Sequence, residues 1–220
     1  MKYLSIVTIF VCYLFIQACI SKECQIPGGY EFEIPVTLSP AKDTFNIGDT
    51  ITISSVFSDL VYETKTQSYY KLENFRFYPS TGIIKIDSIE AIKNMDDFDI
   101  VIGSKYNYGI YTYSSGNRRI EGEYYYENNK YSLNINIIAK NKGLYLFSHG
   151  SSIYGLGEWQ EFEGKCGNVS SDVSTKLNDG VDNNVAFLNN SPDPHYNDWI
   201  LQEPDYRFHR WGGYCFYVRE

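Results

Sequence analysis

The residues best suited to hydrolytic chemistry lie between His149 and Glu163. Hydrolysis by serine needs a hydroxyl, a base and an orienting group close together in space. The run His149-Gly150-Ser151-Ser152 places a histidine beside a serine, but adjacent residues of a strand point to opposite faces. Glu158, Glu161 and Glu163 offer carboxylates for glycoside hydrolysis, but three glutamates in a polar stretch are more typical of a solvated face. We therefore expect a protein that is not an enzyme, with a hydrolase as an alternative.

Oxygen-bearing side chains cluster in a loop that spans residues 178–184, Asn-Asp-Gly-Val-Asp-Asn-Asn. Calcium takes about six to eight oxygen ligands, and Asp179, Asp182 and Asn184 are the candidates for this role. The spacing does not match an EF-hand loop. The alternative is a solvated turn that precedes a helix beginning at Val185. We expect no cofactor other than this calcium ion.

Aromatic side chains are abundant, with 21 Tyr, 13 Phe and 3 Trp. An exposed ring can stack on a flat ligand such as a sugar, and Tyr and Trp add a polar group at the ring edge. Trp211, followed by Gly212-Gly213, is the strongest single candidate for a binding anchor, and Trp199 is considered on the same ground. Trp159, Tyr111 and Tyr113 are further ligand-binding candidates. The alternative is that these rings fill the core and form cross-strand pairs.

Alternation of apolar and polar residues predicts the strands that must position these side chains. The pattern is clear at residues 30–36, 50–57 and 131–137. The turn residues 127–130 predict a hairpin that joins residues 121–126 to 131–137. The run Pro79-Ser80-Thr81-Gly82 predicts a second turn, between strands at 75–78 and 83–86.

From His149 onward the pattern changes, because glycines crowd residues 150–167 and strands become hard to find. Short helices are predicted at 185–188 and 196–202, and a closing strand is predicted at 214–218. The sequence therefore predicts a mainly β fold: an antiparallel, immunoglobulin-like β-sandwich with a looped, partly helical C-terminal insertion before the last strand.

The expected domain organisation has four parts. Residues 1–18 form a signal peptide, residues 19–29 a tether, and residues 30–147 the β-sandwich. Residues 148–220 form an extension that packs on the same domain and carries the closing strand.

The charge balance excludes some classes of partner. Lys and Arg number 19 against 27 Asp and Glu, which gives a formal net charge of −8. Nucleic-acid binding needs a clustered basic surface, and none is evident in this sequence. Docking on anionic lipid by charge alone is disfavoured for the same reason.

The N-terminus combines a positive start, Met1-Lys2, with an uncharged and mostly apolar run from Tyr3 to Ile16. This run is shorter than the roughly 20 residues that a spanning helix needs and is typical of a signal-peptide core. It ends in Ile16-Gln17-Ala18-Cys19, which resembles the lipobox of bacterial lipoproteins, and the chain as a whole resembles lipoproteins of the Bacteroidota. The alternative is an ordinary secretory signal or a single membrane anchor.

The resemblance implies cleavage before Cys19 and diacylglycerol on its sulfur. Lipid chains would then hold the domain on a membrane. The expected location is the bacterial cell envelope, with the anchor in the outer membrane and the domain on the periplasmic face or the cell surface.

The five cysteines are Cys12, Cys19, Cys24, Cys166 and Cys215. If the first leaves with the signal peptide and the second carries lipid, three thiols remain and allow three single pairings. We favour a Cys166–Cys215 disulfide, because both residues lie in the C-terminal third; it would stabilise the fold by roughly 4 kcal/mol. Cys24 is then a free thiol. The alternative is that all three thiols are reduced.

Together these observations predict a non-enzymatic envelope lipoprotein whose β-domain binds a glycan or a protein partner. The first alternative is a structural or assembly lipoprotein of an outer-membrane complex. The second is an envelope hydrolase.

Overall fold

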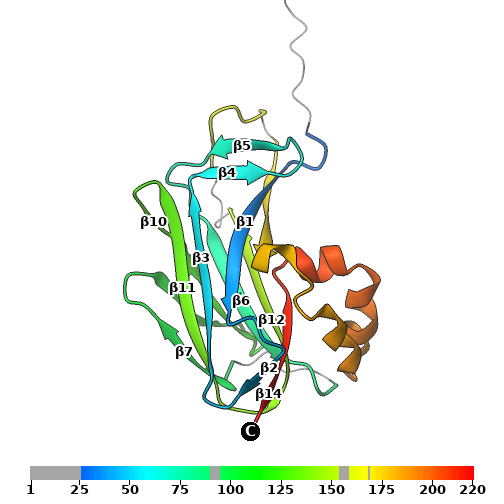
Figure 1. The fold of residues 1–220 in the computed structure, drawn as a ribbon. Helices are drawn as coiled ribbons and strands as arrows, with labels where there is room; N and C mark the ends of the chain where they lie inside the picture. The colour runs from blue at the N-terminus through cyan, green and yellow to red at the C-terminus, as the bar shows by residue number, and fades with distance from the viewer. Residues whose placement is uncertain (1–25, 90–94, 154–158, 168) are drawn as a thin grey trace, which may run out of the picture.

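A computed structural model describes residues 26–89, 95–153, 159–167 and 169–220. The expected signal peptide, the lipidation site Cys19 and most of the tether lie outside these residues. Two β-sheets pack face to face, and short helical segments cover the outer side of one of them (Figure 1). The prediction of a mainly β sandwich with helical pieces near the C-terminus is confirmed.

The first sheet has the spatial order β10-β11-β3-β1-β4-β5; in addition, β7 pairs with β11 and β13 pairs with β1. β11 lies between β3 and β7 and is antiparallel to both. The strands are β1 (Tyr30–Ser39), β3 (Thr50–Ser58), β4 (Leu60–Glu63), β5 (Ser68–Lys71), β7 (Phe98–Ile102), β10 (Tyr125–Glu127), β11 (Lys130–Ala139) and β13 (Ser171–Leu177).

The second sheet has the order β2-β14-β12-β6-β9-β8. Its strands are β2 (Thr44–Asn46), β6 (Tyr78–Lys85), β8 (Asn107–Thr112), β9 (Arg118–Glu123), β12 (Gly143–Ser152) and β14 (Tyr214–Arg219). The β1–β13 and β2–β14 pairs are parallel, so the sheets are mixed and not wholly antiparallel as the sequence predicted.

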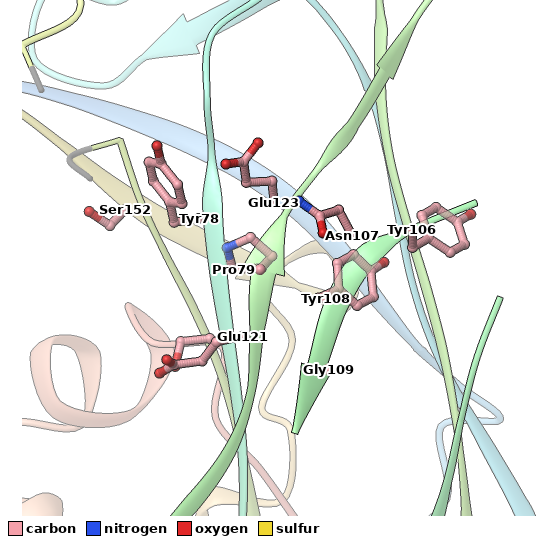
Figure 2. Close-up of a pocket in the computed structure, with 11 residues that line it drawn as sticks. Tyr78, Pro79, Tyr106, Asn107, Tyr108, Gly109, Glu121, Glu123 and Ser152 are labelled. Atoms are coloured by element: carbon pink, nitrogen blue, oxygen red, sulfur yellow. The ribbon is translucent and has the colours of Figure 1, made fainter. Parts of the chain in front are cut away.

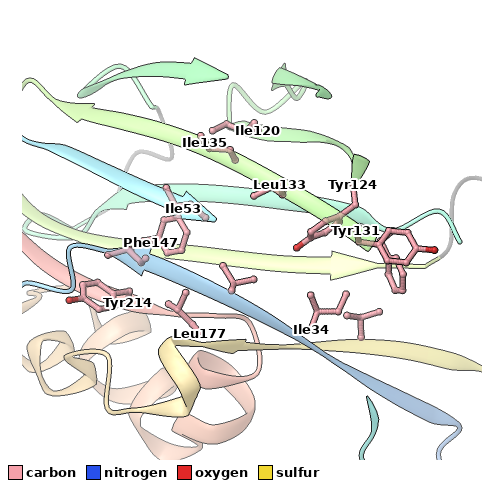
Figure 3. Packing of buried hydrophobic residues seen from close by; sticks show 14 of the residues in the cluster. Ile34, Ile53, Ile120, Tyr124, Tyr131, Leu133, Ile135, Phe147, Leu177 and Tyr214 are labelled. Carbon is pink, nitrogen blue, oxygen red and sulfur yellow. The ribbon is translucent and has the colours of Figure 1, made fainter. Parts of the chain in front are cut away.

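The main core lies between the two sheets and follows from the period-two pattern of their strands. On β11, Tyr131, Leu133, Ile135 and Ile137 are buried, and the intervening residues are only partly covered. Figure 3 shows how the two layers meet, with Ile53 and Leu133 from the first sheet and Phe147 and Tyr214 from the second.

The β10–β11 hairpin is the one that the sequence predicted. Its strands are joined by Asn128 and Asn129, and Glu127 pairs with Lys130 across the turn. Both asparagines have positive φ, at 52° and 60°. A two-residue turn of this kind matches the twist of the flanking strands, and asparagine tolerates the left-handed conformation.

Three short helical segments form a third layer over β6, β12 and β14: η2 (Val185–Asn190), η3 (His195–Ile200) and η4 (Asp205–His209). A fourth segment, η1 (Asn178–Gly180), follows β13 and lies against β1. Leu188, Ile200 and Phe208 from these segments pack on Leu146 and Cys215 of the sheet, which makes a second, smaller core. Within the described ranges, no helix combines the length and the apolar character needed to cross a membrane.

Three expectations about chain organisation were wrong. The predicted turn at Pro79–Gly82 lies inside β6, which runs unbroken from Tyr78 to Lys85. The expected domain boundary at residue 147 falls in the middle of β12. The region after it also supplies β13, a strand of the first sheet, so residues 148–220 contribute to both sheets and are not an extension.

Candidate functional site

A pocket of about 550 Å³ opens on the outer face of the second sheet, beside η3 and η4. Alternation along β6 and β12 exposes every second residue on this face, and those residues form the floor. The helical segments and the turn that follows η4 supply the wall. We call this site the tryptophan pocket; its floor includes Ser80, Arg119, Ser148 and Gly150, and its wall includes His195, Trp199, Tyr206, Arg207 and Trp211.

Backbone hydrogen bonds of Trp211 fix this residue beside β12. Its carbonyl oxygen accepts a hydrogen bond from the backbone N–H of His149 (2.9 Å), and its N–H donates to the carbonyl of Phe208 (3.2 Å). The indole lies over Gly150, where a Cβ would come within 3.0 Å of the ring atom Cε3. The side chain is nevertheless 41% exposed. Glycine at 150 therefore lets a fixed but accessible indole lie flat against the sheet.

Trp199 is the second exposed indole of the pocket, at 45%. It lies on η3 between His195, which stacks on it at 4.9 Å between ring centroids, and the guanidinium of Arg207, 4.2 Å from the ring centroid. Arg207 also forms an ion pair with Glu203 (3.1 Å) and donates to the backbone carbonyl of Trp199. These contacts hold the ring in place, and because both partners lie over it, the exposed part of Trp199 offers a ligand mainly edge contacts.

The floor of the pocket is polar. Arg119 donates from Nε to Ser80 Oγ (2.6 Å) and from an Nη nitrogen to the Ser80 carbonyl (3.1 Å). Ser80 Oγ in turn donates to Glu121 (3.0 Å), which also accepts from the Tyr113 hydroxyl. A Cβ on Gly82 would come within 3.2 Å of Arg119 Nη1. The floor therefore presents a guanidinium that lies along β6 and is fixed by hydrogen bonds.

A second pocket of about 660 Å³ continues from the first, because Tyr78, Ser80 and Ser152 line both. In Figure 2, Tyr78 and Ser152 lie on one side of this pocket and Tyr106 and Tyr108 on the other. We call it the tyrosine pocket, and we call the two pockets together the groove; the further lining residues include Asn107, Glu121 and Glu123.

The tyrosine pocket has well-fixed walls. The rings of Tyr106 and Tyr108 stack at 5.3 Å with an interplanar angle of 17°. The Tyr108 hydroxyl accepts a hydrogen bond from the backbone N–H of Asn134 (3.0 Å), and burial raises the pKa of Tyr108. Glu123 forms an ion pair with Arg76. Carboxylates thus face this pocket, whereas arginines face the tryptophan pocket.

His149 does not face the groove. Its side chain is fully buried in the core, where Nδ1 lies 2.7 Å from Thr81 Oγ1 and Nε2 lies 3.2 Å from the Tyr124 hydroxyl. Burial lowers the pKa of His149 to about 3, so the ring is neutral at physiological pH. The histidine of the His149–Ser152 run therefore belongs to a buried polar network and does not reach a ligand in the groove.

The structure brings only some of the predicted ligand-binding residues together. Trp211 lines the tryptophan pocket. Trp159 is 68% exposed, and its ring centroid lies 5.9 Å from Lys165 Nζ. It lines neither pocket of the groove. Tyr111 and Tyr113 pack on each other edge to face at 4.9 Å; they lie two residues apart at the end of β8, so this is a contact along one strand and not a cross-strand pair. Their predicted roles in ligand binding stay predictions.

The predicted calcium loop is organised by its own amides. Asn184 Nδ2 donates to the carbonyl of Cys215 (2.9 Å), and Asn183 Nδ2 donates to the carbonyl of Leu177 (3.2 Å). Asp179 and Asp182 are exposed. In the part of the chain that the structure describes, no group of three or more His, Cys, Asp or Glu side chains could hold a metal ion. Asn183 and Asn184 thus have a structural role, and the calcium site at Asp179, Asp182 and Asn184 stays a prediction.

The predicted Cys166–Cys215 disulfide is wrong. Cys215 is a free, buried thiol. Residues alternate between the faces of β14, so Cys215 points into the second core under the helical segments, whereas Tyr214 and Phe216 point into the main core. Cys166 packs in the main core, where its backbone N–H donates to the Tyr30 hydroxyl (2.8 Å). The two cysteines therefore lie on opposite sides of the second sheet.

Several groove residues escaped the sequence analysis. Ser80 lay in a predicted turn, and neither Arg119 nor Tyr206 belonged to a recognisable motif. Trp199 was considered as a binding residue in the sequence analysis but was not selected as a ligand-binding candidate. Its neighbour in the pocket, Arg207, lies eight residues away in sequence, a spacing that no simple motif captures.

No family model and no curated protein matches the chain. Among solved structures, two fragments of the human F-spondin reeler domain each give a TM-score of 0.32 at 10% identity. Fragment 2 covers 61% of this chain and 87% of its own length, and fragment 1 covers 68% and 89%. The CupB6 tip adhesin from Pseudomonas aeruginosa gives a TM-score of 0.21 at 11% identity, over 70% of this chain and 43% of the adhesin. Similarities of this size assign the chain to no family.

Proposed function

We propose that this protein is a non-enzymatic binding module of the bacterial cell envelope, anchored by lipid at Cys19, and that its tryptophan pocket binds a glycan. One observation carries the binding proposal. Two partly exposed tryptophans, Trp199 and Trp211, line a single pocket whose floor is polar. Exposed apolar side chains that gather in one place beside polar groups mark a ligand-binding groove, whereas a single exposed ring does not.

The chemistry of the pocket suits a sugar better than a purely apolar ligand. A sugar ring has an apolar face that stacks on indole and a rim of hydroxyls that need hydrogen-bond partners. Ser80, Ser148 and Arg119 supply such partners beside the two rings. A purely apolar ligand would bury these polar groups without partners, which costs free energy.

The carboxylates of the groove are already engaged, which favours binding over catalysis. Glu121 accepts hydrogen bonds from Ser80 and Tyr113, and Glu123 pairs with Arg76. A general acid or base must reach the atoms of the scissile bond, and partners of this kind hold a carboxylate in one place. We assign both residues to orienting hydroxyl groups of the bound glycan.

The binding proposal is tested by screening the intact protein against a glycan array and then titrating the Trp211→Ala variant with each glycan that binds. Removing the indole should weaken binding by at least about tenfold. Trp159→Ala is the matched control, since it deletes an exposed indole outside the pocket, and it should bind as the wild type does. The proposal fails if no glycan binds, or if Trp211→Ala binds with unchanged affinity. Turnover of a bound glycan would favour the hydrolase alternative.

The anchor is tested separately by the intact mass of the protein extracted from its native membrane. Residues 19–220 with diacylglycerol and acyl chains are the expected species. A mass equal to the full chain would contradict the lipoprotein assignment and would leave the binding proposal standing.

A further inference from the structure

Arg119 differs from the other arginines around the groove because, among the described residues, it forms no direct ion pair. Arg76, Arg118, Arg207 and Arg210 each form an ion pair with a carboxylate. Among the residues that the structure describes, no carboxylate lies within ion-pair distance of the Arg119 guanidinium.

The lack of a directly paired carboxylate has a free-energy cost at the position of Arg119. The side chain lies along β6, and burial lowers the pKa of its guanidinium, which reports the cost of holding a charge away from water. Nε and one Nη nitrogen donate to Ser80, the only hydrogen-bond partner that the described residues supply. A half-buried charge that has no carboxylate in direct contact is unfavourable, and a bound anion would offset that cost.

Glu121 is the acidic group nearest to this arrangement. It is tied to Ser80 Oγ and to the Tyr113 hydroxyl, and its negative charge acts on Arg119 through the intervening serine. Glu121 lines the tyrosine pocket, together with Glu123. Arg119 lines the tryptophan pocket, where Arg207 adds a second positive charge. The groove is therefore positive at its indole end and negative at its tyrosine end.

We propose that the tryptophan pocket selects an acidic sugar, one whose carboxylate or sulfate group binds the guanidinium of Arg119. This inference rests on the proposed function and names the ligand class of the same site. The anion receives charge-assisted hydrogen bonds, while the sugar ring stacks on Trp211. Neutral units of the same chain occupy the tyrosine pocket, because an acidic unit there would meet Glu121 and Glu123.

The test uses chemically matched probes. The intact protein is titrated with uronic-acid oligosaccharides and with the same oligosaccharides after reduction of each carboxylate to a hydroxymethyl group. Sulfated oligosaccharides and their desulfated forms are the second arm, which distinguishes the two sources of negative charge. Removing the charge should weaken binding by about tenfold to a hundredfold.

The Arg119→Gln variant should lose that factor for the acidic probe and clearly less for the reduced probe, because a hydroxymethyl group can accept only a neutral hydrogen bond from the guanidinium. Arg219→Gln is the control, since Arg219 also has no ion pair among the described residues and lies on β14 outside both pockets. It should bind both probes normally. Binding of neutral glycans alone, or an equal loss for both probes in Arg119→Gln, would overturn the inference and leave the proposed function standing.

A second measurement does not depend on the variant folding. In the wild type, added salt should weaken binding of the acidic probe and leave the neutral one unaffected, because ion pairs are screened. Equal salt dependence for both probes would overturn the inference. If no glycan of either kind binds, the proposed function itself fails.

Discussion

Replacing Tyr131 by phenylalanine should destabilise the sandwich by an amount that the structure defines well. The ring is fully buried and packs between Phe57 (5.1 Å) and Phe77 (4.9 Å). Its hydroxyl donates to the Leu72 carbonyl (2.5 Å) and accepts from the Phe75 N–H (2.6 Å). Phenylalanine keeps the ring contacts, so the substitution removes the hydroxyl alone and leaves two backbone groups without this partner.

The magnitude follows from those two hydrogen bonds. Each buried group left unsatisfied costs about 1–3 kcal/mol, so for two groups the expected loss in the free energy of unfolding is about 2–6 kcal/mol. For a chain of this length that corresponds to a fall in Tm of roughly 4–24 °C. Thermal and urea unfolding followed by circular dichroism provide the assay, with Tyr69→Phe, an exposed tyrosine of β5, as the control. A loss below about 1 kcal/mol in Tyr131→Phe would refute the reasoning.

Three further predictions concern a thiol, alkaline pH and a glycine. Burial raises the pKa of the Cys215 thiol, so iodoacetamide should modify it only after unfolding, and peptide mapping without reductant should find it outside any disulfide. Burial raises the pKa of Tyr124 to about 12; its contribution to stability is complete below the unfolded value of about 10 and is lost as pH rises through the folded pKa. The urea midpoint should therefore fall above about pH 10, and a constant midpoint would contradict this. Gly212 has φ +55°, and a Cβ there would lie 2.8 Å from the His149 carbonyl oxygen. Gly212→Ala should therefore cost about 1–3 kcal/mol in thermal unfolding, and more than Gly48→Ala, where φ is +89° and the space is open.

The sandwich could be predicted where local patterns agree with burial. Tyr131–Ile137 alternates between buried and partly covered positions, and Asn128-Asn129 suits the tight turn before it. Strand β13 was missed because its inward residues are Ser171, Val173, Thr175 and Leu177, of which only two are apolar. A strand with small polar residues on its buried face shows weak alternation.

The turn predicted at Pro79–Gly82 failed for a related reason. Proline and glycine usually end strands, but here each has a place within β6. Pro79 pairs with Ser151 near the start of the strand. Gly82 leaves room for the Arg119 guanidinium, so the glycine reflects a contact distant in sequence.

The groove could be predicted only in part, because its residues come together from positions that are distant in sequence. The few tryptophans in the sequence are candidates for ligand contact, and one of them, Trp211, does line the pocket. The floor combines side chains of three strands, including Ser80 and Arg119, which meet only after the second sheet has formed. The disulfide prediction failed because proximity in sequence does not show on which face of β14 Cys215 lies.

The most direct test of the groove uses the indole N–H resonances of the intact, isotope-labelled protein, which has three tryptophans. Spectra are recorded with increasing amounts of a glycan that binds, and single Trp→Phe variants assign the resonances. The account predicts that the signals of Trp199 and Trp211 shift together at the measured affinity, while Trp159 serves as the reference outside the pocket. A binding glycan that leaves both Trp199 and Trp211 unshifted would contradict the central claim.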